Sequence, residues 1–88
     1  MDLDIKDLRV LVTAGANGIG LAIAKQLAAS GANTYILDLE RERPAEVASG
    51  FGAHGIIADC SDRAQLERAV HSLPAVPDVV MANAGLVI

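Results

Sequence analysis

A glycine-rich segment, residues 13–20, is the part of this chain best suited to chemistry. Gly15, Gly18 and Gly20 lie between the apolar run at residues 10–12 and an expected helix that begins at Leu21. Glycines let the backbone approach an anion closely, and a helix N-terminus supplies unpaired N–H groups and the positive end of the helix dipole. The segment therefore predicts a site for the pyrophosphate of a dinucleotide. A tight turn without a ligand is the alternative interpretation.

An acidic residue follows the second expected strand. Asp38 lies 18 residues beyond Gly20, where a carboxylate can accept hydrogen bonds from the ribose hydroxyls of an adenosine and repel a 2′-phosphate. This position favours NAD over NADP. Arg41 and Arg43 lie close by, and an arginine there can accommodate a 2′-phosphate. A solvated acid without a ligand is the remaining alternative.

Polar residues also follow the third and fourth expected strands. Asp59 could accept a hydrogen bond from an adenine amino group, and capping of the next helix or exposure to solvent explains it equally well. Cys60 has no neighbouring histidine in sequence, and a buried cysteine is more often a small hydrophobe than a nucleophile. The sequence spacings between His54, His71 and Cys60 are not those of a metal-binding motif, so no metal site is predicted. The turn at residues 83–85 can tie strand ends together.

The order of apolar segments predicts how these residues are positioned. Strands are expected at residues 8–13, 34–37, 55–58 and 78–82, with helices beginning at Leu21, at Pro44 and at Ser61, which is expected as an N-cap. Strict alternation of strand and helix predicts a parallel sheet with right-handed crossovers. We expect the α/β class, with a Rossmann-like doubly wound parallel sheet of about four strands in the order 3-2-1-4 and three helices. Residues 1–88 would then form a single, partial NAD(P)-binding domain.

The carboxyl ends of these strands form one rim of the predicted sheet. Ligands of open α/β sheets bind outside the carboxyl ends of the strands, at the point where the strand order reverses. Thr13, Asp38, Asp59 and Asn83 each lie at such an end. Their convergence on one rim is stronger evidence for a site than any single motif.

Composition excludes several classes of function. The formal net charge is −4, which argues against nucleic acid and anionic membrane as partners. No apolar stretch approaches the roughly 20 residues of a membrane span, and residues 1–7 lack the basic start of a signal peptide. A single cysteine, Cys60, precludes an intrachain disulfide. We expect a cytoplasmic protein.

These motifs together resemble those of the short-chain dehydrogenase/reductase family. The family's T-G-x-x-x-G-I-G motif fits residues 13–20, with Ala14 in place of its first glycine. Its N-N-A-G motif fits residues 82–85, with Ala82 in place of the first asparagine. The resemblance extends over essentially all 88 residues. It implies that Ala14, Gly15, Asn17, Gly18, Ile19 and Gly20 surround the pyrophosphate, Asp38 and Leu39 hold the adenosine ribose, Asp59 and Cys60 the adenine, and Asn83, Ala84 and Gly85 lie beneath the cofactor near its nicotinamide ribose.

The same resemblance implies that the chemical step needs residues from elsewhere. The family's catalytic Ser and its Tyr-x-x-x-Lys pair come further along the chain, whereas the only tyrosine here, Tyr35, lies inside the second expected strand. No catalytic residue is therefore predicted, and the chain alone is expected to be inactive. The expected function is the NAD-binding portion of a short-chain oxidoreductase. A non-enzymatic adenine-nucleotide-binding module, or a structural fragment without a ligand, is the alternative.

The fourth strand is expected to form an edge of the sheet. Val79 and Val80, with the apolar residues 86–88, are difficult to shield from water when no further strand pairs with them. Exposed apolar edges favour self-association. We therefore expect an oligomer or an aggregation-prone fragment.

Overall fold

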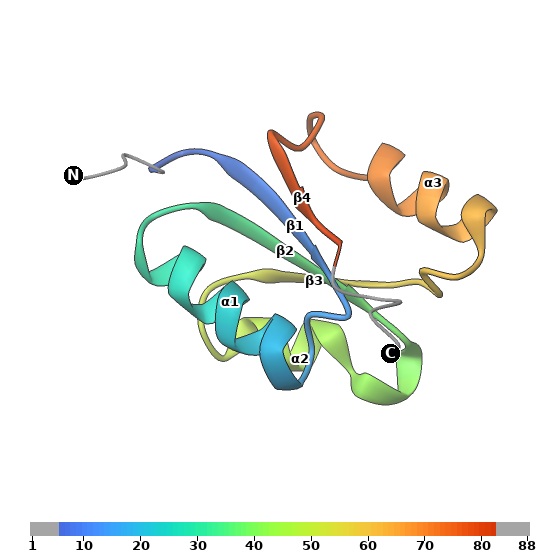
Figure 1. Cartoon of the computed structure of the whole chain (residues 1–88), viewed down its shortest axis with the longest axis horizontal. Coiled ribbons are helices and arrows are strands. Elements are labelled where there is room, and N and C mark those ends of the chain that lie inside the picture. The colour runs from blue at the N-terminus through green and yellow to red at the C-terminus, as the bar shows by residue number, and fades with distance from the viewer. Residues whose placement is uncertain (1–5, 83–88) are drawn as a thin grey trace.

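The computed structural model describes residues 6–82 of the chain. Its four strands are β1 (Arg9–Thr13), β2 (Asn33–Asp38), β3 (His54–Ile57) and β4 (Val79–Met81). All pairings are parallel, and the strand order is β3-β2-β1-β4 (Figure 1). The predicted Rossmann-like sheet and its strand order are confirmed.

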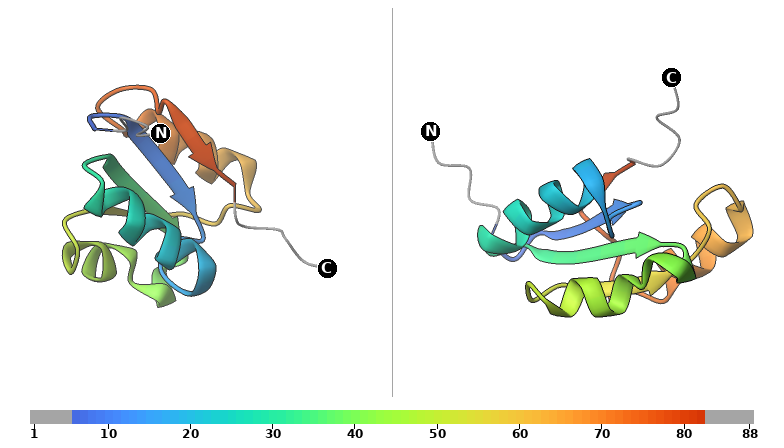
Figure 2. Two further views of the ribbon diagram at one scale, coloured as in Figure 1. Left: turned by 60° about the vertical axis from the view of Figure 1, so that its left-hand side comes forward. Right: turned by 90° about the horizontal axis from the view of Figure 1, so that it is seen from below.

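Three α-helices connect these strands: α1 (Gly18–Ala29), α2 (Pro44–Ser49) and α3 (Arg63–His71). A short 3-10 helix, η1 (Glu40–Glu42), precedes α2. In Figure 1, α1 and α2 lie on one side of the strands and α3 lies on the other. This arrangement follows from right-handed crossovers on both sides of a reversal in strand order, and Figure 2 shows it from two further directions.

Two apolar clusters, one on each face of the sheet, hold the layers together. Alternate residues of a strand point to opposite faces, so Val10 and Val12 face α1 and α2 while Leu11 faces α3. In the cluster that contains Val10 and Val12, the buried residues that come from helices are small. These are Ala24 of α1 and Ala48 of α2, both fully buried. Small residues let both helices lie close to strands that are apolar on both faces.

The start of α1 differs from the sequence prediction. The helix begins at Gly18, three residues before the predicted Leu21. Its buried positions are Gly20 and Ala24, while Ile19 is 73% exposed. Ile19 therefore lies on the protein surface, beside the glycine-rich loop, and not in the core.

The start of α3 also differs, because Asp62 and not Ser61 is its N-cap. The Oδ1 atom of Asp62 accepts hydrogen bonds from the backbone N–H groups of Ala64 (3.0 Å) and Gln65 (3.3 Å). The Ser61 hydroxyl instead donates to Asp59 Oδ1 at 2.6 Å. The prediction of Ser61 as the cap is wrong because its hydroxyl has a stronger, charged acceptor on the other side.

Candidate functional site

The glycine-rich loop connects β1 to α1 by passing directly over β2. A Cβ atom added to Gly15 would lie 2.7 Å from Ile36 Cβ and 3.0 Å from the carbonyl oxygen of Val12. The backbone N–H of Gly15 donates to the carbonyl of Leu37 at 3.4 Å. Only glycine allows the loop to approach the strand this closely. Packing against β2 therefore holds the loop in position at the sheet rim.

The other side of the loop is open. Gly18 has a φ of +58°, and a Cβ atom added there would meet nothing within 4 Å. Ala14, where the related family motif has glycine, also has a positive φ, of 53°. Among the described residues, no atom lies against the open side of Gly18 at the start of α1, as in loops that admit a phosphate group.

In the part of the chain that the structure describes, no side chain caps the N-terminus of α1. Asn17 occupies the N-cap position but makes no side-chain hydrogen bond to the first turn, and the first turn contains no acidic residue. Its amide Nδ2 instead donates to Glu42 Oε2 at 2.8 Å. The first N–H groups of a helix lack intrahelical partners. Within residues 6–82, the structure shows no side-chain acceptor for these groups at the start of α1, an arrangement that suits an anion.

Asp38 lies at the carboxyl end of β2 and is 8% exposed. Its Oδ2 accepts a hydrogen bond from the backbone N–H of Ala16 at 3.0 Å, and its Oδ1 accepts one from Leu39 at 2.8 Å. An ionised carboxylate has about four lone-pair sites, so these two bonds leave acceptor capacity on both oxygens. Asp38 thus anchors the loop and can still accept hydroxyl groups.

A cavity of about 280 Å³ lies next to Asp38 at the rim. It brings together four residues that the family resemblance assigns to the adenosine, from β2 and from the segment after β3, and one that it assigns to the pyrophosphate, from the loop. The lining consists of Ala14, Asp38, Leu39, Asp59 and Cys60, together with Ala58 and Ser61. The predicted convergence of these strand ends is therefore present in the structure, while their role in binding stays a prediction.

The two residues after Ala58 have altered acidity. Hydrogen bonds from the hydroxyl (2.6 Å) and backbone N–H (2.9 Å) of Ser61 lower the pKa of the Asp59 carboxyl below its usual value. Burial raises the pKa of the Cys60 thiol. The hydrogen bonds from Ser61 thus favour the charged form of Asp59 at the edge of the cavity, and burial disfavours the thiolate form of Cys60 in its wall.

A second, mostly apolar cavity of about 420 Å³ lies between the sheet and α3. It shares Cys60 and Ser61 with the first cavity and reaches β4 at Val80. Thr13, which also lines it, donates from its hydroxyl to the carbonyl of Met81 at 3.3 Å. Thr13 therefore ties the carboxyl ends of β1 and β4 together.

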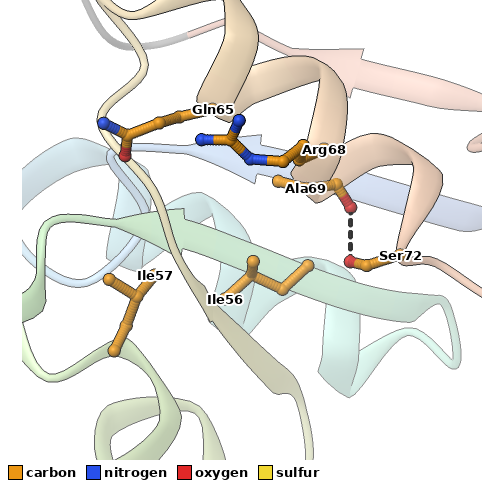
Figure 3. A pocket seen from close by; sticks show the side chains of 6 residues that line it. All are labelled: Ile56, Ile57, Gln65, Arg68, Ala69 and Ser72. Atoms are coloured by element: carbon orange, nitrogen blue, oxygen red, sulfur yellow. Dashed lines mark hydrogen bonds between the residues drawn. The ribbon is translucent and has the colours of Figure 1, made fainter.

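A third hollow, of about 270 Å³, lies between β3 and α3 (Figure 3). Its lining includes Ile56, Arg68 and Gln65, and none of its residues is among the predicted site residues. Gln65 Oε1 accepts a hydrogen bond from the backbone N–H of Asp59 at 3.0 Å. This bond fastens the segment beside the adenosine cavity to α3.

Sequence reasoning missed Glu42 and Ser61 as parts of this rim. Glu42 lies in a run of charged residues that predicts a solvated turn, and no local pattern indicates its bond to Asn17, 25 residues away. The remaining predicted residues, Asn83, Ala84 and Gly85, lie outside the described residues. Within residues 6–82, no group of three His, Cys, Asp or Glu side chains could hold a metal ion. No helix in the same range is long and apolar enough to cross a membrane.

Comparison with known proteins decides the family. A family model described as short chain dehydrogenase matches residues 8–88. The chain belongs to the short-chain dehydrogenase family. The short-chain dehydrogenase/reductase PhomF of Diaporthe leptostromiformis is 36% identical to it over 89 residues, which cover 93% of this chain and 30% of that protein.

Two solved structures have the same fold. L-sorbose reductase from Gluconobacter frateurii, complexed with NADPH and L-sorbose, matches with a TM-score of 0.77 and 28% identity over 94% of this chain and 36% of its own. RhlG from Pseudomonas aeruginosa, solved as an NADP active-site complex, matches with a TM-score of 0.79 and 31% identity over 97% of this chain and 38% of its own. This chain therefore spans about a third of the length of these relatives.

Proposed function

We propose that this short-chain dehydrogenase chain binds NAD, with the pyrophosphate at the N-terminus of α1 and the adenosine in the cavity beside Asp38. The observation that carries the proposal is the uncapped start of α1, where Gly18 opens onto free space and Asn17 turns its side chain toward Glu42. A helix N-terminus of this kind favours negative charge both through its N–H groups and through its dipole. The residues present fit a dinucleotide.

Each part of the proposed site has a separate role. The backbone of residues 14–20 holds the pyrophosphate, and Leu39 covers the ribose that Asp38 binds. Asp59 and Cys60 border the adenine. Residues 83–85, by the family's motif, would contact the nicotinamide ribose. The nicotinamide supplies hydride chemistry when bound, and this chain binds and orients the cofactor.

The preference for NAD rests on the charge and burial of Asp38. Its carboxylate is held in place by two backbone N–H groups, so it cannot move away from a 2′-phosphate. Repulsion between fixed like charges disfavours NADP. Two relatives bind NADP or NADPH, which makes the choice of cofactor a property to be measured for this chain.

The family relationship extends the proposal to the whole protein's activity. We propose an oxidoreductase that acts on alcohol or carbonyl groups in the cytoplasm, and we expect these 88 residues alone to bind the cofactor without turnover.

We also propose self-association through β4. Val79 and Val80 are 40% and 52% exposed, as the sequence predicts, and an exposed edge strand of this kind pairs readily with another chain. Sedimentation velocity at increasing concentration would test the self-association.

Ile19→Glu tests the pyrophosphate site directly. Ile19 is 73% exposed in the first turn of α1, so a carboxylate there stabilises the helix by about 0.3–1 kcal/mol through its dipole. The same charge occupies the place of the pyrophosphate. We expect calorimetric titration with NAD⁺ to show affinity reduced at least about tenfold, while thermal stability is unchanged or raised.

Ile57→Glu is the matched control. Ile57 is also a mostly exposed isoleucine, at the end of β3, and lies outside the proposed site. Its substitution should leave affinity for NAD⁺ within about twofold. Equal losses of affinity in both variants, or no heat of binding from the wild-type chain with NAD⁺, NADP⁺ or ATP, would refute the proposed function.

A further inference from the structure

The contact between Asn17 and Glu42 joins the glycine-rich loop to η1. Glu42 Oε2 accepts from Asn17 Nδ2 at 2.8 Å, across 25 residues of sequence. The Glu42 side chain is only 32% exposed, whereas the Arg41 side chain beside it is 79% exposed. Glu42 is therefore a half-buried carboxylate held against the loop, and not simply a member of a solvated charge run.

Two carboxylates contact adjacent residues of the same loop. Asp38 accepts from the backbone N–H of Ala16, and Glu42 accepts from the side chain of Asn17. Consecutive Cα atoms lie about 3.8 Å apart, so both negative charges are attached to one short part of the loop, between the adenosine cavity and the start of α1.

The nearby arginines are each engaged with a glutamate. Arg41 Nε lies 3.9 Å from Glu42 Oε1, and Arg43 Nη1 lies 3.4 Å from Glu46 Oε2. Exposed ion pairs of this kind are weak, but they offset the positive charge that would attract a 2′-phosphate. The arginines that suggest NADP from sequence are thus opposed by glutamates in the structure.

We propose that Glu42 is a second specificity-determining residue, which acts with Asp38 to favour NAD⁺ over NADP⁺. The inference rests on the proposed dinucleotide site. Glu42 has two effects: its charge repels the 2′-phosphate, and its hydrogen bond holds Asn17 away from the start of α1. The second effect leaves the helix N-terminus free for the pyrophosphate.

Glu42→Gln separates the two effects. The amide oxygen of glutamine can still accept from Asn17, while the negative charge is removed. We expect calorimetric affinity for NADP⁺ to rise about fivefold, from the loss of one repulsive charge pair, with affinity for NAD⁺ unchanged within about twofold. The gain for NADP⁺ should shrink at about 1 M salt, where the Debye length falls to about 3 Å.

Glu67→Gln is the control for the charge change. Glu67 lies on α3, on the opposite face of the sheet, and pairs with Arg63 at 3.1 Å. This variant should not alter the ratio of the two affinities. If the wild-type chain binds NAD⁺ and Glu42→Gln leaves the ratio unchanged, the role of Glu42 is refuted and the dinucleotide site stands. If the wild-type chain binds neither cofactor, the site itself is refuted, and this inference with it.

Discussion

Replacing Gly15 with alanine should destabilise the fold more than the same replacement at Gly50. The new Cβ would lie 2.7 Å from Ile36 Cβ and 2.8 Å from Ile36 Cγ2. Carbon atoms pack at about 3.5–4.0 Å, so each contact is short by about 1 Å. Ile36 is fully buried in β2, and its Cβ is fixed to the strand backbone, so no rotamer change relieves the first contact.

The loop or the strand must therefore move. Overpacking in a well-packed core costs about 1–3 kcal/mol, and contact with a fixed Cβ places Gly15→Ala near the upper end of that range. Domains are stabilised by roughly 0.05–0.15 kcal/mol per residue, which for 88 residues gives about 4–13 kcal/mol. The substitution should remove between about a quarter and most of the stability of the chain.

Urea denaturation followed by circular dichroism measures this loss. With a slope of about 1 kcal/mol per molar urea for a small domain, we expect the midpoint to fall by about 2–3 M. Gly50→Ala is the matched control because Gly50 has a helical φ of −68°. Its added Cβ meets only the Val47 carbonyl oxygen, at 3.3 Å. That variant should remain within about 1 kcal/mol of wild type, and equal midpoints for the two variants would refute the packing argument.

Two further predictions concern residues of the adenosine cavity. Ala14→Gly should raise stability by about 0.5–1 kcal/mol, because Ala14 has a φ of 53° and the left-handed region is strained for alanine; an unchanged or lower thermal midpoint would contradict this. Cys60 should react slowly with iodoacetamide near neutral pH, because burial raises its pKa and only the thiolate is the nucleophile. Its alkylation, followed by mass spectrometry, should accelerate only above the ordinary thiol pKa, and NAD⁺ should slow it. Labelling as fast as that of a free thiol would contradict the half-buried position of Cys60 in the cavity wall.

The layered fold can be predicted from the sequence because two patterns, the apolar runs and their alternation with helices, indicate the same topology. Apolar runs that end in a polar residue, such as the run before Asp38, define the strands and their carboxyl ends at once. Strict alternation with helices then leaves one common topology. The rim follows from that topology alone, which explains why residues from three separate strand ends line one cavity.

The sequence-based predictions are wrong where a side chain has more than one possible hydrogen-bond partner. Ser61 and Asp62 are both good N-caps in sequence, and only the position of Asp59 decides that Ser61 turns away from α3. Asn17 could likewise cap its own helix, yet it bonds to Glu42 instead. Which hydrogen bond forms depends on contacts between segments that are distant in sequence, and the periodicity of apolar residues in helices and strands does not predict those contacts.

The most direct test of the dinucleotide site is an NMR titration of the ¹⁵N-labelled chain with NAD⁺. Backbone amide signals report each residue separately, and the proposed pyrophosphate lies against the first N–H groups of α1. We predict the largest shifts at Gly18, Ile19 and Gly20, with smaller shifts around Asp38 and Cys60. Shifts confined to α3 and β4, or an unchanged spectrum at saturating NAD⁺, would contradict binding at the glycine-rich loop.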